Sequence, residues 1–252
     1  MKKFLPILLG ALGLASVAAT PASAQIAGLS ANAAVTTNYV FRGITQSAKR
    51  PAVSAGLDFT IPDTGLAVGT WVSSINFGDD TPMEWDLYAN YNFMLGPVNA
   101  SIGGIGYVYT YAGNFGPYTY FEFNGSLSYT MDIVTLTAKA NIAPGLPNGF
   151  LSIRNGYNPD TEFYLSGGAS VAVAPWLSLS GNVGYQGYGG NPPGINDGYV
   201  EYDIGATATY DKYSLDLRYI NTSKHAGPGI TSVGPYFNTG PFFVATFSFK
   251  FP

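Results

Sequence analysis

The chain has 252 residues, of which 10% are charged and 15% are aromatic, and it contains no cysteine. It has 11 Lys and Arg against 15 Asp and Glu, an acidic balance that argues against nucleic acid as a partner. Without cysteine there is no disulfide framework, and with a single histidine, His225, we expect neither a transition-metal site nor any other cofactor.

The amino terminus has the three parts of a secretory signal peptide. Two lysines follow Met1, an apolar run extends from Phe4 to about Ala19, and Ala22-Ser23-Ala24 is a small-residue cleavage site. An N-terminal membrane anchor is the alternative, but the apolar run is short and ends in small residues. We therefore predict a cleaved signal peptide at residues 1–24 and an exported bacterial protein whose residues 25–252 form one β domain.

After residue 25, apolar and polar residues alternate in successive stretches of about ten residues. In Met83–Phe93 one set is apolar, and the interleaved set is Glu84, Asp86, Tyr88, Asn90 and Asn92. A period of two places the two sets on opposite faces of a β-strand. No convincing helical stretch and no later run of 18 apolar residues is present, so no second layer covers the apolar faces. The pattern is typical of an all-β, transmembrane, antiparallel up-and-down β-barrel whose apolar face meets lipid.

Short turns and longer connections alternate along the mature chain. Such barrels have short periplasmic turns and longer extracellular loops, and two periplasmic termini require an even number of strands. The twelve predicted strands are Leu29–Arg42, Ala52–Ile61, Leu66–Phe77, Met83–Phe93, Val98–Tyr111, Tyr118–Tyr129, Val134–Ala143, Glu162–Val173, Leu177–Gln186, Tyr199–Tyr210, Tyr213–Asn221 and Phe242–Phe251.

One segment near the start of the mature chain carries a family pattern. In Thr36–Asp58 an aromatic strand is followed by Phe41-Arg42-Gly43, Thr45-Gln46-Ser47, Pro51-Ala52 and Gly56-Leu57-Asp58. This segment resembles the opening of the TorF-type porins, the Gcw_chp group of outer-membrane proteins. The resemblance implies a barrel of this type and at most a pore, and it supplies no catalytic residues.

The carboxyl terminus resembles the signal that barrel-assembly machinery reads. Aromatic and apolar residues alternate from Phe243 to Phe251, although Pro252 then follows where such substrates commonly end in an aromatic residue. We expect the assembly machinery, outer-membrane lipid and lipopolysaccharide as partners. The sequence does not reveal an oligomeric state.

Charged residues fall on the polar face of the predicted strands. A Lys or Arg on the lipid face near the bilayer midplane would cost about 2–4 kcal/mol, so this asymmetry is expected of a barrel. The predicted pore-lining residues are Arg42, Asp58, Glu84, Asp86, Glu122, Lys139, Glu162, Glu201, Asp203, Asp216, Arg218 and Lys250.

Eight of these residues are acidic and four are basic, which favours a weak preference for cations. In the alternative interpretation the charges pair across the interior and stabilise the strands, for example Arg42 with Asp58 and Arg218 with Asp216. Even if every base pairs with one acid, four of the eight acids would remain without a basic partner.

The width of a twelve-stranded barrel lies between a filled eight-stranded barrel and an aqueous porin of sixteen strands or more. Inward tyrosines would fill the lumen, and inward glycines would leave space. The long loops Pro144–Thr161 and Thr222–Pro241 also carry Arg154 and Lys224, which could fold toward an acidic mouth. A narrow channel is favoured, and a closed barrel is the alternative. The inward tyrosines are Tyr88, Tyr107, Tyr109, Tyr120 and Tyr164, and the inward glycines are Gly103, Gly168, Gly184 and Gly205.

Aromatic residues gather near both ends of the predicted strands, which suits the two membrane interfaces. A sugar-stacking track formed by the inward tyrosines is the alternative use of such rings. The predicted bands are Tyr91, Phe93, Tyr129, Trp176, Tyr210, Tyr213 and Phe251 near the short turns, and Tyr39, Phe41, Trp71, Phe77, Trp85, Tyr185 and Tyr219 near the long loops.

The sequence predicts a channel in the bacterial outer membrane for passive diffusion of ions and small hydrophilic solutes. A non-conducting structural or surface-interaction barrel is the alternative. We expect no enzyme, because nothing orients His225 as the base of a catalytic triad beside Ser223. Asp79-Asp80 could hold Ca²⁺ or bridge lipopolysaccharide weakly, but a polar turn is the simpler interpretation of this pair.

Overall fold

The computed structural model describes residues 26–111, 114–115, 119–144, 161–188, 198–223 and 239–251. The predicted signal peptide, Arg154, Lys224 and His225 lie outside the described residues. Across the described ranges, no helix has the length and apolar character that a membrane crossing requires.

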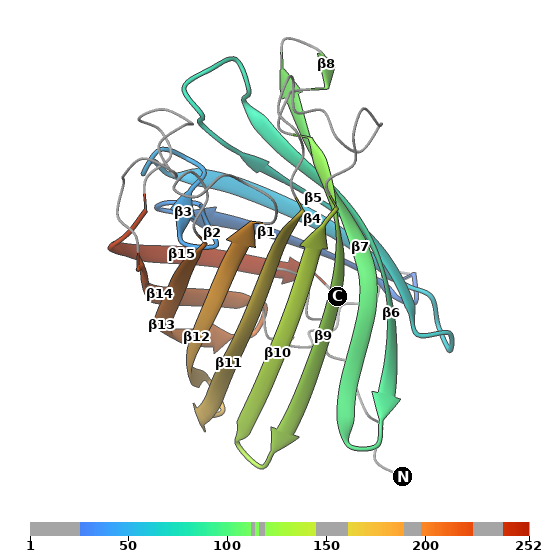
Figure 1. Cartoon of the computed structure of the whole chain (residues 1–252). Helices are drawn as coiled ribbons and strands as arrows, with labels where there is room; N and C mark the ends of the chain where they lie inside the picture. Colours follow the sequence, from blue (N-terminus) through green and yellow to red (C-terminus); the bar gives the residue numbers. More distant parts are fainter. Residues whose placement is uncertain are drawn as a thin grey trace.

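Twelve long antiparallel strands form one closed barrel (Figure 1). Each strand pairs with its neighbours in the chain, and the first pairs with the last to complete the ring. The number of strands and the up-and-down order are those predicted from the alternation. The twelve are β1 (Leu29–Thr36), β4 (Ala52–Thr60), β5 (Leu66–Ser74), β6 (Met83–Leu95), β7 (Val98–Tyr111), β9 (Tyr120–Met131), β10 (Val134–Ala143), β11 (Glu162–Ala174), β12 (Leu177–Tyr188), β13 (Tyr199–Tyr210), β14 (Tyr213–Thr222) and β15 (Phe242–Phe251), while β8 (Asn114–Phe115) pairs only with the end of β7.

The two ends of the barrel differ in their connections. At one end, here called the turn end, short connections join β4 to β5, β6 to β7, β9 to β10, β11 to β12 and β13 to β14. Asp63, Asp132 and Asp211 lie in three of these turns with positive φ angles, which aspartate tolerates better than most residues. The opposite end, where β4, β6, β9, β11, β13 and β15 begin, is called the loop end.

The outer wall of the barrel is apolar and the inner wall is polar. On β6, for example, Leu87 is 50% exposed on the outside, whereas Glu84 and Asp86 face inward and are only 1% and 5% exposed. Eleven of the twelve predicted charges lie on barrel strands, and all eleven are buried or half-buried on inward positions. The alternation therefore sorts side chains between the two faces as the sequence predicts.

The predicted first strand, Leu29–Arg42, is too long. Strand β1 ends at Thr36, and the chain then turns into a small hairpin of β2 (Val40–Phe41) and β3 (Ile44–Thr45). Local hydrogen bonds replace the strand pairing, because the Asn38 side chain accepts bonds from the hydroxyls of Thr45 (2.5 Å) and Ser47 (3.2 Å). Residues 37–51, called the inner hairpin below, thus form neither the end of a barrel strand nor a simple outer loop.

Candidate functional site

The inner hairpin crosses the barrel interior at the loop end. On one side, the Tyr39 hydroxyl donates a 2.6 Å hydrogen bond to Glu84 on β6. On the other side, Val40 packs against a buried apolar cluster that includes Ile220 on β14 and Phe242 on β15. Because β6 and β14 lie far apart around the ring, the hairpin spans the space that a solute would have to pass.

The tip of the hairpin is a two-residue turn, Arg42-Gly43, with φ angles of 47° and 78°. Positive φ at both central residues is the requirement of a type I′ turn, the tight connection that best suits the twist of a hairpin. Gly43 meets this requirement without strain and also lies close to the wall, since a Cβ atom there would sit 2.3 Å from Cγ2 of Thr222. Arg42 is a costly residue in the left-handed region, so its side chain needs strong contacts to remain there.

Arg42 makes those contacts with the opposite wall. Its two terminal nitrogens donate to both carboxylate oxygens of Glu122 on β9, at 2.8 and 2.7 Å, and one also donates to Gln186 on β12 at 3.0 Å. The guanidinium carbon lies 4.5 Å from the centre of the Tyr164 ring on β11. The side chains of Arg42 and Glu122 are only 9% and 2% exposed, so this bidentate pair is well shielded from solvent.

The predicted pairing of Arg42 with Asp58 is wrong. The inner hairpin carries Arg42 away from β4, and Asp58 instead accepts a 2.6 Å hydrogen bond from the Tyr88 hydroxyl. The predicted pairing of Arg218 with Asp216 is confirmed at 2.9 Å, and Arg218 also pairs with Asp203. The pairing interpretation therefore holds for part of the interior, with one partner different from the expected one.

Residues of the wall orient Glu122 independently of the hairpin. Its Oε2 atom accepts hydrogen bonds from the side-chain amide of Asn141 on β10 (3.0 Å) and from the Tyr107 hydroxyl on β7 (3.3 Å). Nearby, Glu201 accepts hydrogen bonds from the Tyr164 hydroxyl and from Asn182. These bonds fix the wall side chains that surround the Arg42 guanidinium.

The structure distributes the twelve predicted charges unevenly along the barrel axis. Five acids lie within the first four residues of their strands at the loop end, where Arg42 is the base from the same set: Glu84, Asp86, Glu122, Glu162 and Glu201. The other six lie nearer the middle or the turn end, with three acids and three bases: Asp58, Asp203, Asp216, Lys139, Arg218 and Lys250. The formal charge of this set is therefore −4 at the loop end and zero elsewhere. Their role as pore-lining residues stays a prediction.

The predicted aromatic band at the loop end is partly wrong. Tyr39, Phe41 and Phe77 contribute to an interior cluster with Tyr107 and Tyr109, and Trp71 packs edge-on against Tyr39. The remaining members, Trp85, Tyr185 and Tyr219, lie on outward positions. Strand parity offered a signal for Trp71, because it shares its face with Gly69 and Ser73 rather than with Val68 and Val72. The interior rings narrow the loop end.

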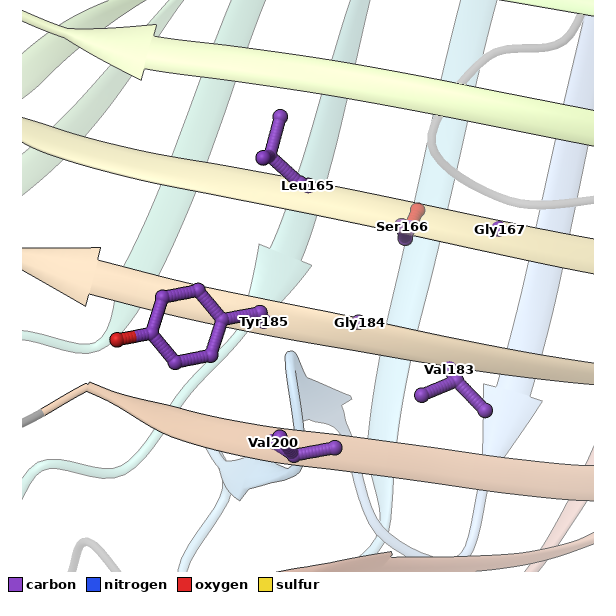
Figure 2. A pocket seen from close by; sticks show the side chains of 7 residues that line it. All are labelled: Leu165, Ser166, Gly167, Val183, Gly184, Tyr185 and Val200. Atoms are coloured by element: carbon purple, nitrogen blue, oxygen red, sulfur yellow. The ribbon is translucent and has the colours of Figure 1, made fainter.

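The outer wall has a shallow hollow over β11, β12 and β13 (Figure 2). Leu165, Val183 and Tyr185 surround it, and Gly167, which lies on the same outward face, leaves space between these side chains. The lining is mostly apolar and faces outward, so the hollow suits an acyl chain rather than a hydrophilic solute. Within the described part of the chain, no group of three or more His, Asp or Glu residues is arranged to hold a metal ion.

Several solved structures of other proteins resemble this fold at low sequence identity. They include opdK from Pseudomonas aeruginosa, with 12% identity, 91% of this chain and 68% of that chain covered, and a TM-score of 0.44. OpdL from Pseudomonas aeruginosa has 13% identity, coverage of 91% and 68%, and a TM-score of 0.43. OccK5 (OpdH) from the same organism has 11% identity, coverage of 91% and 69%, and a TM-score of 0.44. These similarities concern the fold alone.

No curated protein matches the sequence. A family model described as "Bacterial protein of unknown function (Gcw_chp)" matches residues 18–247, nearly the whole chain. This match agrees with the resemblance seen in Thr36–Asp58, and the chain belongs to the Gcw_chp family.

Proposed function

We propose that this protein is an outer-membrane channel for the passive diffusion of ions and small hydrophilic solutes, with a weak preference for cations. The observation that carries the proposal is the sorting of side chains in a closed barrel. Large apolar residues cover the outside, and every charged residue on the barrel strands faces the interior. Such an interior is the usual lining of a hydrophilic pore.

The apolar exterior supports a membrane location. Leu87, Ile102, Val183, Ile204 and Leu217 are each at least half exposed on the outer wall, which water would disfavour and lipid would accept. The closed ring pairs the strand backbones, as spanning lipid requires. Together with the predicted signal peptide, these features support the outer membrane, with lipid, lipopolysaccharide and the assembly machinery as partners.

The cation preference follows from where the charge lies. A solute entering from the loop end first meets the six predicted charges whose formal sum is −4, and acidic residues raise the local concentration of cations. The inner hairpin and the interior aromatic cluster occupy the same level, so the free path is narrow. Ions and small solutes are therefore more suitable than large ones.

A non-conducting barrel is the second candidate, and one observation favours it. The inner hairpin contacts β6 on one side and β14 on the other, and its Arg42 is buried against β9. A barrel filled in this way could act through its long loops instead. The expectation that the protein is not an enzyme stays a prediction, because His225 lies outside the described residues.

Conductance in a planar bilayer under a salt gradient tests the proposal. The refolded protein should give stable current steps and a reversal potential on the cation-selective side. Replacing Glu84 by Gln and Asp86 by Asn should move the reversal potential toward zero, because these acids lie at the acidic loop end. Asp58→Asn and Lys250→Met together serve as the matched control, since they remove one acid and one base from the neutral part.

Correct folding is checked by heat-modifiable mobility on a gel. A folded barrel that never conducts would refute the channel and favour the second candidate. A reversal potential that ignores Glu84→Gln and Asp86→Asn would refute the acidic loop end as the source of selectivity.

A further inference from the structure

The guanidinium group of Arg42 lies among hydrogen-bond acceptors and an aromatic ring of three wall residues, and a second ring contact, 4.6 Å to Phe41, comes from the hairpin itself. Glu122 offers two parallel acceptors, Gln186 offers a third, and the Tyr164 ring offers a flat aromatic face. A planar fork of N–H donors satisfies the two carboxylate oxygens together, which a compact ammonium group does not match. The three residues form a site selective for guanidinium, here called the guanidinium cage.

The guanidinium cage belongs to the barrel wall and not to the hairpin. Its three residues lie on β9, β12 and β11, and other wall residues hold two of them. Asn141 and Tyr107 orient Glu122, and the hydroxyl of Tyr164 is bonded to Glu201. The cage should therefore keep its shape when Arg42 leaves, as a preorganised binding site does.

The backbone conformation at Arg42 also indicates that the contacts of its side chain explain the presence of arginine. Its φ of 47° is a conformation that asparagine adopts far more readily than arginine in a two-residue turn. The turn itself thus gives no reason for arginine at this position. The reason lies in the cage that its side chain reaches.

We propose that Arg42 acts as an internal ligand of the guanidinium cage, and that a solute bearing a guanidinium group competes with it and displaces the inner hairpin. The opening step rests on the proposed channel function, whereas the binding step does not. The excess of acids among the predicted charges at the loop end favours this competition, because it attracts cations from outside. The inferred solute class is small organic cations with a guanidinium group.

Binding of methylguanidinium to an Arg42→Asn variant tests the cage directly. Asparagine tolerates the positive φ, so the turn is retained while the internal ligand is removed. Titration calorimetry in detergent should show binding at least tenfold tighter than to the wild-type protein. Methylammonium at the same concentrations should bind at least tenfold more weakly than methylguanidinium. The double variant Arg42→Asn/Glu122→Gln should lose the binding.

Equal binding by the single and double variants, or equal binding of the two cations, would overturn the guanidinium cage. Gel mobility confirms that each variant is a folded barrel before titration. Since binding is measured without current, this result does not depend on the channel.

The opening step is tested by bilayer recording of the wild-type protein. Methylguanidinium added from the loop side should raise the frequency of open events severalfold, and methylammonium should not. If the Arg42→Asn variant binds methylguanidinium and conducts, but methylguanidinium leaves the wild-type current unchanged, the proposed displacement of the hairpin is wrong. The proposed channel function is then still supported. If no variant conducts, the channel fails and the opening step fails with it.

Discussion

Replacing Gly43 by alanine should release the inner hairpin from the barrel wall. The substitution places a methyl group in a backbone with φ of 78°, a left-handed conformation that costs about 1–2 kcal/mol for a residue with a side chain. The new Cβ atom would also lie 2.3 Å from Cγ2 of Thr222, and overpacking of this kind costs about 1–3 kcal/mol. Together the two effects disfavour the docked hairpin by about 2 kcal/mol or more, which is about a 30-fold change in the docking equilibrium.

Single-channel recording is the suitable assay, because an undocked hairpin no longer occupies the loop end. The Gly43→Ala variant should show larger or more frequent open steps than the wild-type protein, with unchanged gel mobility of the folded barrel. Adding Thr222→Ser removes the clashing methyl group and keeps the hydroxyl, so the double variant should recover part of the closed behaviour.

Gly96→Ala provides a matched control at the turn end. Its φ of 59° carries a similar backbone penalty, but nothing lies within 4 Å of the added Cβ atom. Its conductance should equal that of the wild-type protein. If Gly43→Ala is folded and also conducts as the wild-type protein does, the reasoning that the docked hairpin limits the pore is refuted.

Three further predictions concern the wall, the ion pair and the solvent. Leu87→Arg on the outer face should lower the free energy of unfolding in lipid vesicles by about 2–4 kcal/mol. Leu95→Arg at the turn end should lower the same free energy by about 0–1 kcal/mol. Equal decreases for the two variants would contradict a lipid-facing wall. Glu122→Gln should raise the open probability of the channel, because it leaves the buried Arg42 without its carboxylate and so destabilises the docked hairpin by about 3 kcal/mol. Arg42→Lys should have a smaller effect. A conductance that neither variant changes would show that this pair does not hold the hairpin. Cation preference should weaken between 0.1 M and 1 M salt, as the screening length falls from about 10 Å to about 3 Å, and a preference independent of salt would point to another origin.

Most of the barrel could be predicted from the sequence because one physical rule acts on every strand. Lipid on the outside and polar groups on the inside impose a period of two, and the end of each predicted strand agrees with the structure within a few residues apart from the first. The same rule places Glu84, Asp86 and Glu122 on the inner face. Their accumulation at the loop end also follows from the strand boundaries.

The inner hairpin could not be predicted from the same period of two. Val40-Phe41 and Ile44-Thr45 are short β segments, so the alternation continues from β1 without an obvious break. The available signal was Arg42-Gly43 itself, a glycine-containing pair between two β segments, which indicates a two-residue turn. The partner of Arg42 lies 80 residues further along the chain, and no local pattern identifies a contact at that distance.

The pairing of β1 with β15 is the one place where the ring closes between the two ends of the chain rather than across a connecting turn. The bonds just beyond this seam also fix the base of the inner hairpin, because the Thr37 amide donates to the Ala245 carbonyl at 2.9 Å and the Ala245 amide donates to the Thr37 hydroxyl at 3.0 Å. Before the last strand joins the first, the base of the inner hairpin is held on the β4 side alone, through the pairing of Thr36 with Ala52. Completion of the ring therefore adds the second anchor of the inner hairpin, and a barrel whose seam has not formed is expected to hold the hairpin less firmly.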